Sequence, residues 1–87
     1  MGKKAKLFQK ALTSPQNINF EDFITLLLAF GFELARVRGS HHIFSHRASP
    51  ELLSIQPRGD GKAKPYQLRQ FFTLVEQYNL HLEEDRE

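Results

Sequence analysis

Apolar and polar positions alternate with a helical period in the first half of the chain. Over residues 20–30, "FEDFITLLLAF", apolar side chains recur every three or four positions. Asn19 stands in the N-cap position, and two acidic residues follow in the first turn, where they suit the helix dipole. Gly31 then fits the position just beyond a helix end. The pattern predicts an amphipathic helix over 20–30.

The next segment, "FELARVR" (32–38), has the shorter period of a strand, but the alternation is imperfect. Phe32 and Leu34 share one phase, whereas Ala35 and Val37 share the other. One extra residue in the strand would bring both sets to the same face, because a β-bulge shifts the alternation by one position. We therefore expect a bulge near Ala35.

Two further strands are expected. The dipeptide "GS" (39–40) indicates a tight hairpin turn, and "HHIFSH" (41–46) is the return strand. "RASPE" (47–51) is predicted to be a loop, and "LLSIQ" (52–56) a short third strand.

A polar, glycine-rich loop, "PRGDGKAK" (57–64), leads to a second helix. Pro65 suits its first position, because the N–H that proline lacks would have no partner there. Apolar side chains on one side then predict a helix over 65–79: Leu68, Phe71, Phe72, Val75 and Tyr78.

The two ends of the chain are less regular. Residues 3–12, "KKAKLFQKAL", suit either a short helix or a mobile basic arm, and Pro15 interrupts any helix there. The last residues, 81–87, "HLEEDRE", form an acidic tail that is expected to fray. The chain thus divides into a basic extension (1–18), one domain (19–80) and the tail.

The order helix, three strands, helix predicts an α+β fold. Three antiparallel strands with both helices on one face is the simplest way to bury their apolar sides. The other face of the sheet is then open, and an added N-terminal helix is possible. A chain of 87 residues supports one such domain.

Composition excludes several kinds of chemistry. The chain has no cysteine, which excludes disulfides, a thiolate nucleophile and a thiolate zinc site. No run approaches the roughly 20 apolar residues that span a bilayer. The basic start also lacks the apolar centre of a signal peptide. We expect a cytoplasmic protein without a membrane partner.

The net charge of +2 is unevenly distributed. Residues 36–69 hold seven basic and two acidic residues, a net +5, and the first ten residues are +4. Residues 76–87 are −4. A basic middle segment favours a polyanionic partner, although an ordinary solvated surface is an equally good interpretation of charge alone.

Three of the four histidines lie in "HHIFSH". If Phe44 faces the core, His42 shares its face, and His41 points to the open face. His42 then packs inward. His46 lies roughly 13 Å from His42 along the strand, so one ion cannot bridge the two rings. We therefore predict no metal site and no cofactor.

Nucleophilic catalysis by Ser40 and His41 lacks an acid to orient the imidazole. RNA cleavage requires less, because the 2′-OH of RNA is the nucleophile and a histidine beside cations can take its proton. His41, close to Arg38 across the turn, is the candidate for this role.

The sequence resembles the HicA toxin family, also described as YcfA-like. The resemblance rests on "GFELARVRGSHHIFSH", the short third strand and "KPYQLRQFFTLVEQYNL". It implies a double-stranded-RNA-binding-like fold, messenger-RNA cleavage and a HicB-type antitoxin as partner. By the same resemblance His41 is catalytic, Gly39 matches the family glycine, and Arg36 and Arg38 are the basic strand residues.

The sequence departs from the family pattern in the third strand and in the lysine-rich stretch that follows it. Gln56 stands where many members carry a third-strand histidine, and the lysine-rich stretch is reduced. Even so, Lys62, Lys64 and Arg69 stand at the start of the last helix, where double-stranded-RNA-binding domains contact phosphates. We predict an RNA-binding set of Arg36, Arg38, Gly39, Ser40, Lys62, Lys64 and Arg69. The alternatives are a non-catalytic RNA-binding module and a protein-interaction domain.

Overall fold

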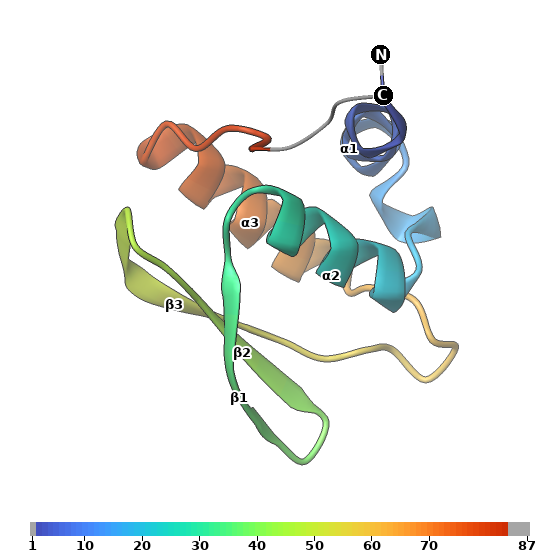
Figure 1. Cartoon of the computed structure of the whole chain (residues 1–87). Coiled ribbons are helices and arrows are strands. Elements are labelled where there is room, and N and C mark those ends of the chain that lie inside the picture. The colour runs from blue at the N-terminus through green and yellow to red at the C-terminus, as the bar shows by residue number, and fades with distance from the viewer. Residues whose placement is uncertain (1, 84–87) are drawn as a thin grey trace.

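The computed structural model describes residues 2–83. Within them the chain forms three α-helices, one short 3-10 helix and three strands (Figure 1). In chain order these are α1 (Lys3–Thr13), η1 (Pro15–Asn17), α2 (Phe20–Ala29), β1 (Glu33–Arg38), β2 (His41–His46), β3 (Ser49–Ile55) and α3 (Pro65–Gln77). The strands form one antiparallel sheet in the order β1-β2-β3, which confirms the predicted α+β fold.

The β1–β2 hairpin has the predicted irregularity. The register shifts between Leu34 and Arg36, so Ala35 is the extra residue of a bulge. As a result, Leu34 pairs with Phe44 and Val37 with His42, and the two large apolar side chains of β1 lie on the helix side of the sheet. In the turn, Gly39 has a positive φ of 60°, whereas the φ of Ser40 is not positive. This combination is that of a type II′ hairpin turn.

The third strand begins earlier than predicted. β3 starts at Ser49, so most of "RASPE" belongs to the sheet and is not a loop. The prediction took residues 47–51 as a loop, but β3 is an edge strand, and an edge strand tolerates Pro50 because it needs hydrogen bonds on one side only.

The helices cover one face of the sheet and enclose a phenylalanine-rich core. Phe71 of α3 lies at its centre, with ring centroids 5.8 Å from Phe23, 5.2 Å from Phe30 and 6.0 Å from Phe32. α2 begins after Asn19, as predicted, but the Asn19 side chain makes no capping hydrogen bond. Gly31 follows α2 with φ +92°, the left-handed conformation expected just beyond a helix end.

The N-terminal extension is a folded helix and not a mobile arm. α1 packs through Phe8, whose ring lies 4.9 Å from Phe30 and 5.9 Å from Phe72, and through the fully buried Ala11. Figure 1 shows α1 beside α2 and α3, on the side away from the sheet. The extension therefore belongs to the same core as the domain that follows it.

The segment after α3 is held in place as far as Glu83. Leu80 is buried, and the Glu83 N–H donates to the Ala29 carbonyl at 2.8 Å. The expected fraying is therefore wrong for residues 81–83, and residues 84–87 lie outside the described part of the chain. None of the helices within residues 2–83 has both the length and the apolar character that a membrane span requires.

Candidate functional site

The tip of the β1–β2 hairpin brings together five of the eight residues predicted for the site. Arg36, Arg38, Gly39, Ser40 and His41 are all exposed. Arg38 pairs with His41 across the turn, and Arg36 pairs with Ile43. Because paired residues share a face, the two guanidinium groups and the His41 imidazole lie on the open face of the sheet.

His41 has a free ring. No hydrogen bond or ion pair within residues 2–83 involves its imidazole, and no acid pairs with it across either neighbouring strand. If the β2–β3 register continues by one residue, Gln56 comes opposite His41. An exposed, unbonded imidazole beside two cations is able to accept a proton from a bound molecule.

His42 points the other way, toward the helices. Its ring lies 5.1 Å from that of Phe20, edge to face, and it is half-buried. Its Nδ1 lies 3.1 Å from the Ser40 carbonyl, and a carbonyl accepts only, so Nδ1 carries the proton. This geometry agrees with the prediction that His42 packs inward.

His46 is a core residue with both ring nitrogens in use. Nε2 lies 2.8 Å from the Phe30 carbonyl and donates to it, and Nδ1 accepts the Ala48 N–H at 3.0 Å. The side chain is buried against the ring of Phe32. Neither nitrogen is available to a ligand, and residues 2–83 contain no group of three or more metal-ligating side chains.

A second cationic group lies in the loop between β3 and α3. The Phe20 N–H donates to the Gly61 carbonyl at 3.0 Å, and the Ala63 N–H donates to the Ile18 carbonyl at 2.8 Å. These bonds fix the loop against the start of α2. Because the Phe20 ring also contacts His42, the loop and the hairpin flank the same residue.

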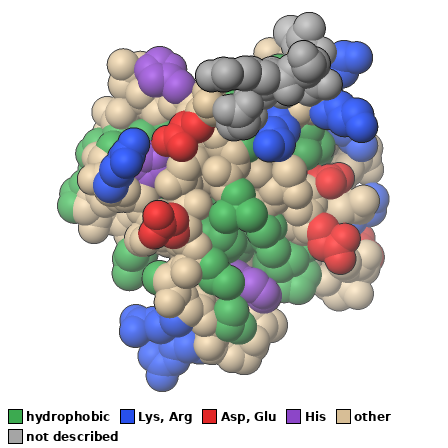
Figure 2. Space-filling view, in the orientation of Figure 1, with side chains coloured by type: hydrophobic (Ala, Val, Ile, Leu, Met, Phe, Trp, Pro, Cys, Tyr) green, Lys and Arg blue, Asp and Glu red, His purple; other side chains and the backbone are tan. Residues whose placement is uncertain are grey.

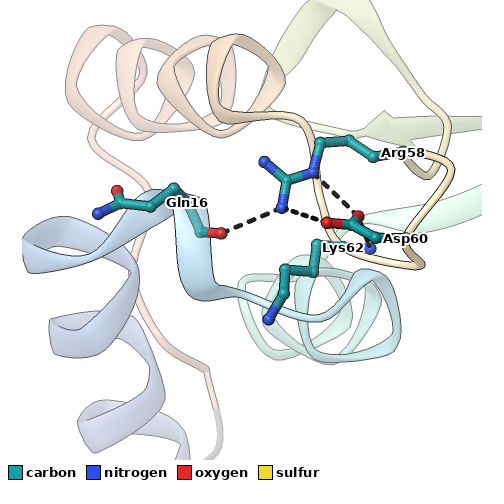
Figure 3. Close-up of polar contacts among 4 residues, drawn as sticks. All are labelled: Gln16, Arg58, Asp60 and Lys62. Atoms are coloured by element: carbon teal, nitrogen blue, oxygen red, sulfur yellow. Dashed lines mark hydrogen bonds and ion pairs between the residues drawn. The ribbon is translucent and has the colours of Figure 1, made fainter.

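The loop is internally braced by Arg58 and Asp60 (Figure 3). Arg58 donates to the two Asp60 carboxylate oxygens at 3.1 and 2.9 Å and to the Gln16 carbonyl at 3.3 Å. Asp60 also accepts the Lys62 N–H at 3.1 Å. The hydrogen bonds from Arg58 and from the Lys62 main chain lower the pKa of Asp60. Arg58 is thus neutralised by Asp60 and contributes little to the basic character of the segment.

The predicted cations of the loop and of α3 do not form one cluster. Lys62 and Lys64 are half-buried, and Lys64 is the N-cap residue of α3, whose N-terminus has no side-chain cap. Arg69 lies farther along α3. It lines a groove of about 430 Å³ between α3 and β3, together with Glu51 and Leu53. Arg69 therefore serves a different surface.

Sequence reasoning did not identify Gln67. This side chain is buried, and its Oε1 accepts the N–H of Gln56 at 3.1 Å, just beyond the end of β3. It holds the main chain of Gln56, the residue that follows Ile55, which pairs with His42. Its spacing could have indicated that it is buried, because Gln67 lies four residues before Phe71 and therefore on the same side of the helix.

Comparison with known proteins adds one match. The model of the HicA toxin family of bacterial toxin–antitoxin systems matches residues 20–78, which span α2, the whole sheet and α3. No curated protein and no solved structure matches the chain. The matched segment covers more than half of the chain and includes the His41 hairpin, and the chain therefore belongs to the HicA toxin family.

Proposed function

We propose that this toxin is a metal-independent endoribonuclease that binds and cleaves messenger RNA, with His41 as its catalytic residue. One observation carries the proposal: the His41 ring is exposed and unbonded on the open face of the sheet, beside Arg36 and Arg38. The family assignment supports the role of toxin, and the geometry supports the chemistry.

The reaction uses the RNA itself as the nucleophile. Neutral His41 accepts the proton of a 2′-OH, and the resulting oxygen attacks the adjacent phosphorus. The bond from phosphorus to the 5′ oxygen breaks, and that oxygen takes a proton from the imidazolium or from water. The products are a 2′,3′-cyclic phosphate and a 5′-OH. Arg36 and Arg38 stabilise the negative charge that develops on the phosphorane.

Binding of the RNA backbone involves the turn and the loop. Gly39 and Ser40 place no bulky side chain at the turn, so a phosphate can approach the main chain there. Lys62 and Lys64 lie in the loop that is bonded to the start of α2, and their proposed role is to add phosphate contacts beside the hairpin. The uncapped N-terminus of α3 adds its own attraction for phosphate. Arg69 is outside this surface because of its position in the β3–α3 groove.

A HicB-type antitoxin is the proposed partner, and covering the His41 hairpin would inhibit the toxin directly. The proposed substrate, messenger RNA, places the activity in the cytoplasm.

The test compares wild type with His41→Ala on RNA in the presence of a chelator. We expect the variant to lose roughly 10²- to 10⁴-fold in cleavage rate, the usual contribution of a general base. His81→Ala is the matched control, because His81 is also exposed but lies after α3, near His46 and Ala48 and thus at the opposite end of β2 from His41. RNA with a single 2′-deoxy substitution at the cleaved position should also resist cleavage, because it lacks the nucleophilic 2′-OH. Equal cleavage by wild type and His41→Ala would contradict the proposal.

A non-catalytic RNA-binding module is the second candidate function. It is favoured by the absence, within the described residues, of any group that orients the His41 ring, and by Gln56, which directly follows Ile55, the partner of His42. This alternative predicts that wild type binds RNA without cleaving it and that His41→Ala binds equally well.

A further inference from the structure

The edge strand β1 is exposed along its whole length. All six of its residues are accessible, and no other strand of the described chain pairs with its outer side. Leu34 and Val37 point to the helix side of the sheet but remain 48% and 49% exposed, because the helices do not reach over this strand. Figure 2 shows hydrophobic side chains running from α2 down to the hairpin, with basic side chains on the other side of it.

The main-chain polar groups of Leu34 and Val37 point to the outer edge of β1, the side that pairs with no strand of the described chain. In a two-residue hairpin the residues that flank the turn, Arg38 and His41, form a hydrogen-bonded pair. Hydrogen-bonded and open pairs then alternate along an antiparallel ladder. The pairs of Val37 with His42 and, beyond the bulge, of Leu34 with Phe44 are therefore open. At Val37 and Leu34 the N–H and C=O groups point away from β2.

The sequence of β1 is complementary to itself. Consider two β1 strands that pair antiparallel about a two-fold axis between Ala35 and Arg36. Leu34 of each copy then lies opposite Val37 of the other, and Glu33 lies opposite Arg38. Each facing pair occurs twice, so two apolar pairs and two pairs of opposite charge form.

The bulge makes this register possible. In a regular strand, Glu33 and Arg38 would lie on opposite faces, because they are five residues apart. The extra residue, Ala35, places both on the open face, with Glu33 opposite Ser45 and Arg38 opposite His41. The same shift places Leu34 and Val37 together on the helix side.

We propose that β1 is a docking edge for a second copy of this chain, paired antiparallel in this register. The two sheets then form one six-stranded sheet, with the helices of both copies on one face and both His41 rings on the other. The contact is small, so the dimer is expected to be weak and transient. This proposal does not depend on nuclease activity.

Cysteine crosslinking of the purified full-length chain tests the register. The natural chain has no cysteine, so Leu34→Cys and Val37→Cys each introduce a single thiol. Facing residues of a hydrogen-bonded pair have Cα atoms about 5.5 Å apart, within disulfide range, whereas identical residues across this axis are farther apart. An oxidised mixture of the two variants should give several-fold more mixed disulfide than either variant alone gives of its own dimer, as resolved by mass spectrometry.

A second pair of cysteine variants controls for disulfides that form by random collision of two chains. Leu12→Cys and Leu52→Cys place thiols at positions of similar exposure outside β1, and their mixture should show no such preference. If the bulge and the arginines instead keep β1 unpaired, both mixtures will crosslink equally, and the proposal is wrong.

A charge exchange tests the ionic pairs within the crosslinking variants. Glu33→Arg alone and Arg38→Glu alone should each reduce the mixed disulfide several-fold, because each places like charges opposite one another. Both changes in the same chain should restore it, since the opposite charges again face each other. Failure of the double exchange to restore crosslinking would overturn the proposed register.

Discussion

At the scale of single residues, the three histidines of β2 have three different environments. Strand alternation separates the exposed His41 from the inward-facing His42, and this much is evident in the sequence. The role of His46 is not evident, because its partners Phe30 and Ala48 come from the end of α2 and from the next turn. The burial of His46 depends on where α2 ends relative to the sheet.

Substitution of His46 should destabilise the fold. In His46→Ala the Phe30 carbonyl and the Ala48 N–H lose their side-chain partner in a buried region. We expect a loss of about 1–3 kcal/mol in the free energy of unfolding. Urea unfolding measures it, and His81→Ala should stay within about 0.5 kcal/mol of wild type. An unchanged midpoint for His46→Ala would mean that these two bonds add no net stability.

At the scale of elements, α1 shows how one side chain decides between two interpretations. Four lysines and no acid make residues 3–12 a poor isolated helix, because like charges three or four positions apart repel. Phe8 reverses this balance by inserting its ring beside Phe30 and Phe72, while Ala11 lies buried. The helix exists because of this packing, which local sequence does not reveal.

Truncation of Phe8 should therefore release α1. For Phe8→Ala we expect a loss of about 2 kcal/mol in unfolding free energy, less than for a fully buried phenylalanine because the ring is half-buried. Amide hydrogen exchange should show loss of protection across α1, with the sheet unaffected. Leu12→Ala on the exposed side of α1 is the control and should leave protection unchanged. Protection of α1 that survives Phe8→Ala would show that other contacts hold the helix.

At the scale of the whole molecule, the fold divides a basic segment that is continuous in sequence. Arg36 and Arg38 lie at the hairpin, whereas Lys62 and Lys64 lie in the loop beyond Phe20. Arg58 is paired with Asp60, and Arg69 lines a separate groove. Helix α1, which carries four lysines, lies at the opposite end of the molecule from the hairpin turn (Figure 1). The net charge of +5 therefore overstates the cationic surface near His41.

This division predicts how RNA affinity depends on salt. Under the proposed function, replacing Arg36 and Arg38 with glutamine should lower the slope of log affinity against log salt by about 1 to 2, the value for two lost phosphate contacts. Replacing Lys3, Lys6 and Lys10 removes more charge but should leave the slope unchanged, because α1 is remote from the site. Titrations at several salt concentrations measure both. A larger effect from the lysines would place the RNA on α1.

The sequence by itself determined the order of the elements, the bulge at Ala35, the Gly39 turn and the opposite faces of His41 and His42. All of these depend on local rules, since the period of apolar residues and the conformation of glycine act over a few neighbouring positions. Its errors at residues 49–51, which were predicted to be loop, and in the tail have a common origin. Whether a proline is tolerated in a strand, or a tail is held, depends on what lies beside it.

Tertiary structure alone decided which cations share a surface, that His46 is buried and that α1 joins the core. These properties arise from contacts between segments far apart in the chain, such as Phe8 with Phe72 or Gln16 with Arg58. It also left β1 uncovered, because the helices pack over the other two strands. Leu34 and Val37 have the same alternation as buried strand residues, so only the position of the helices shows that they are exposed.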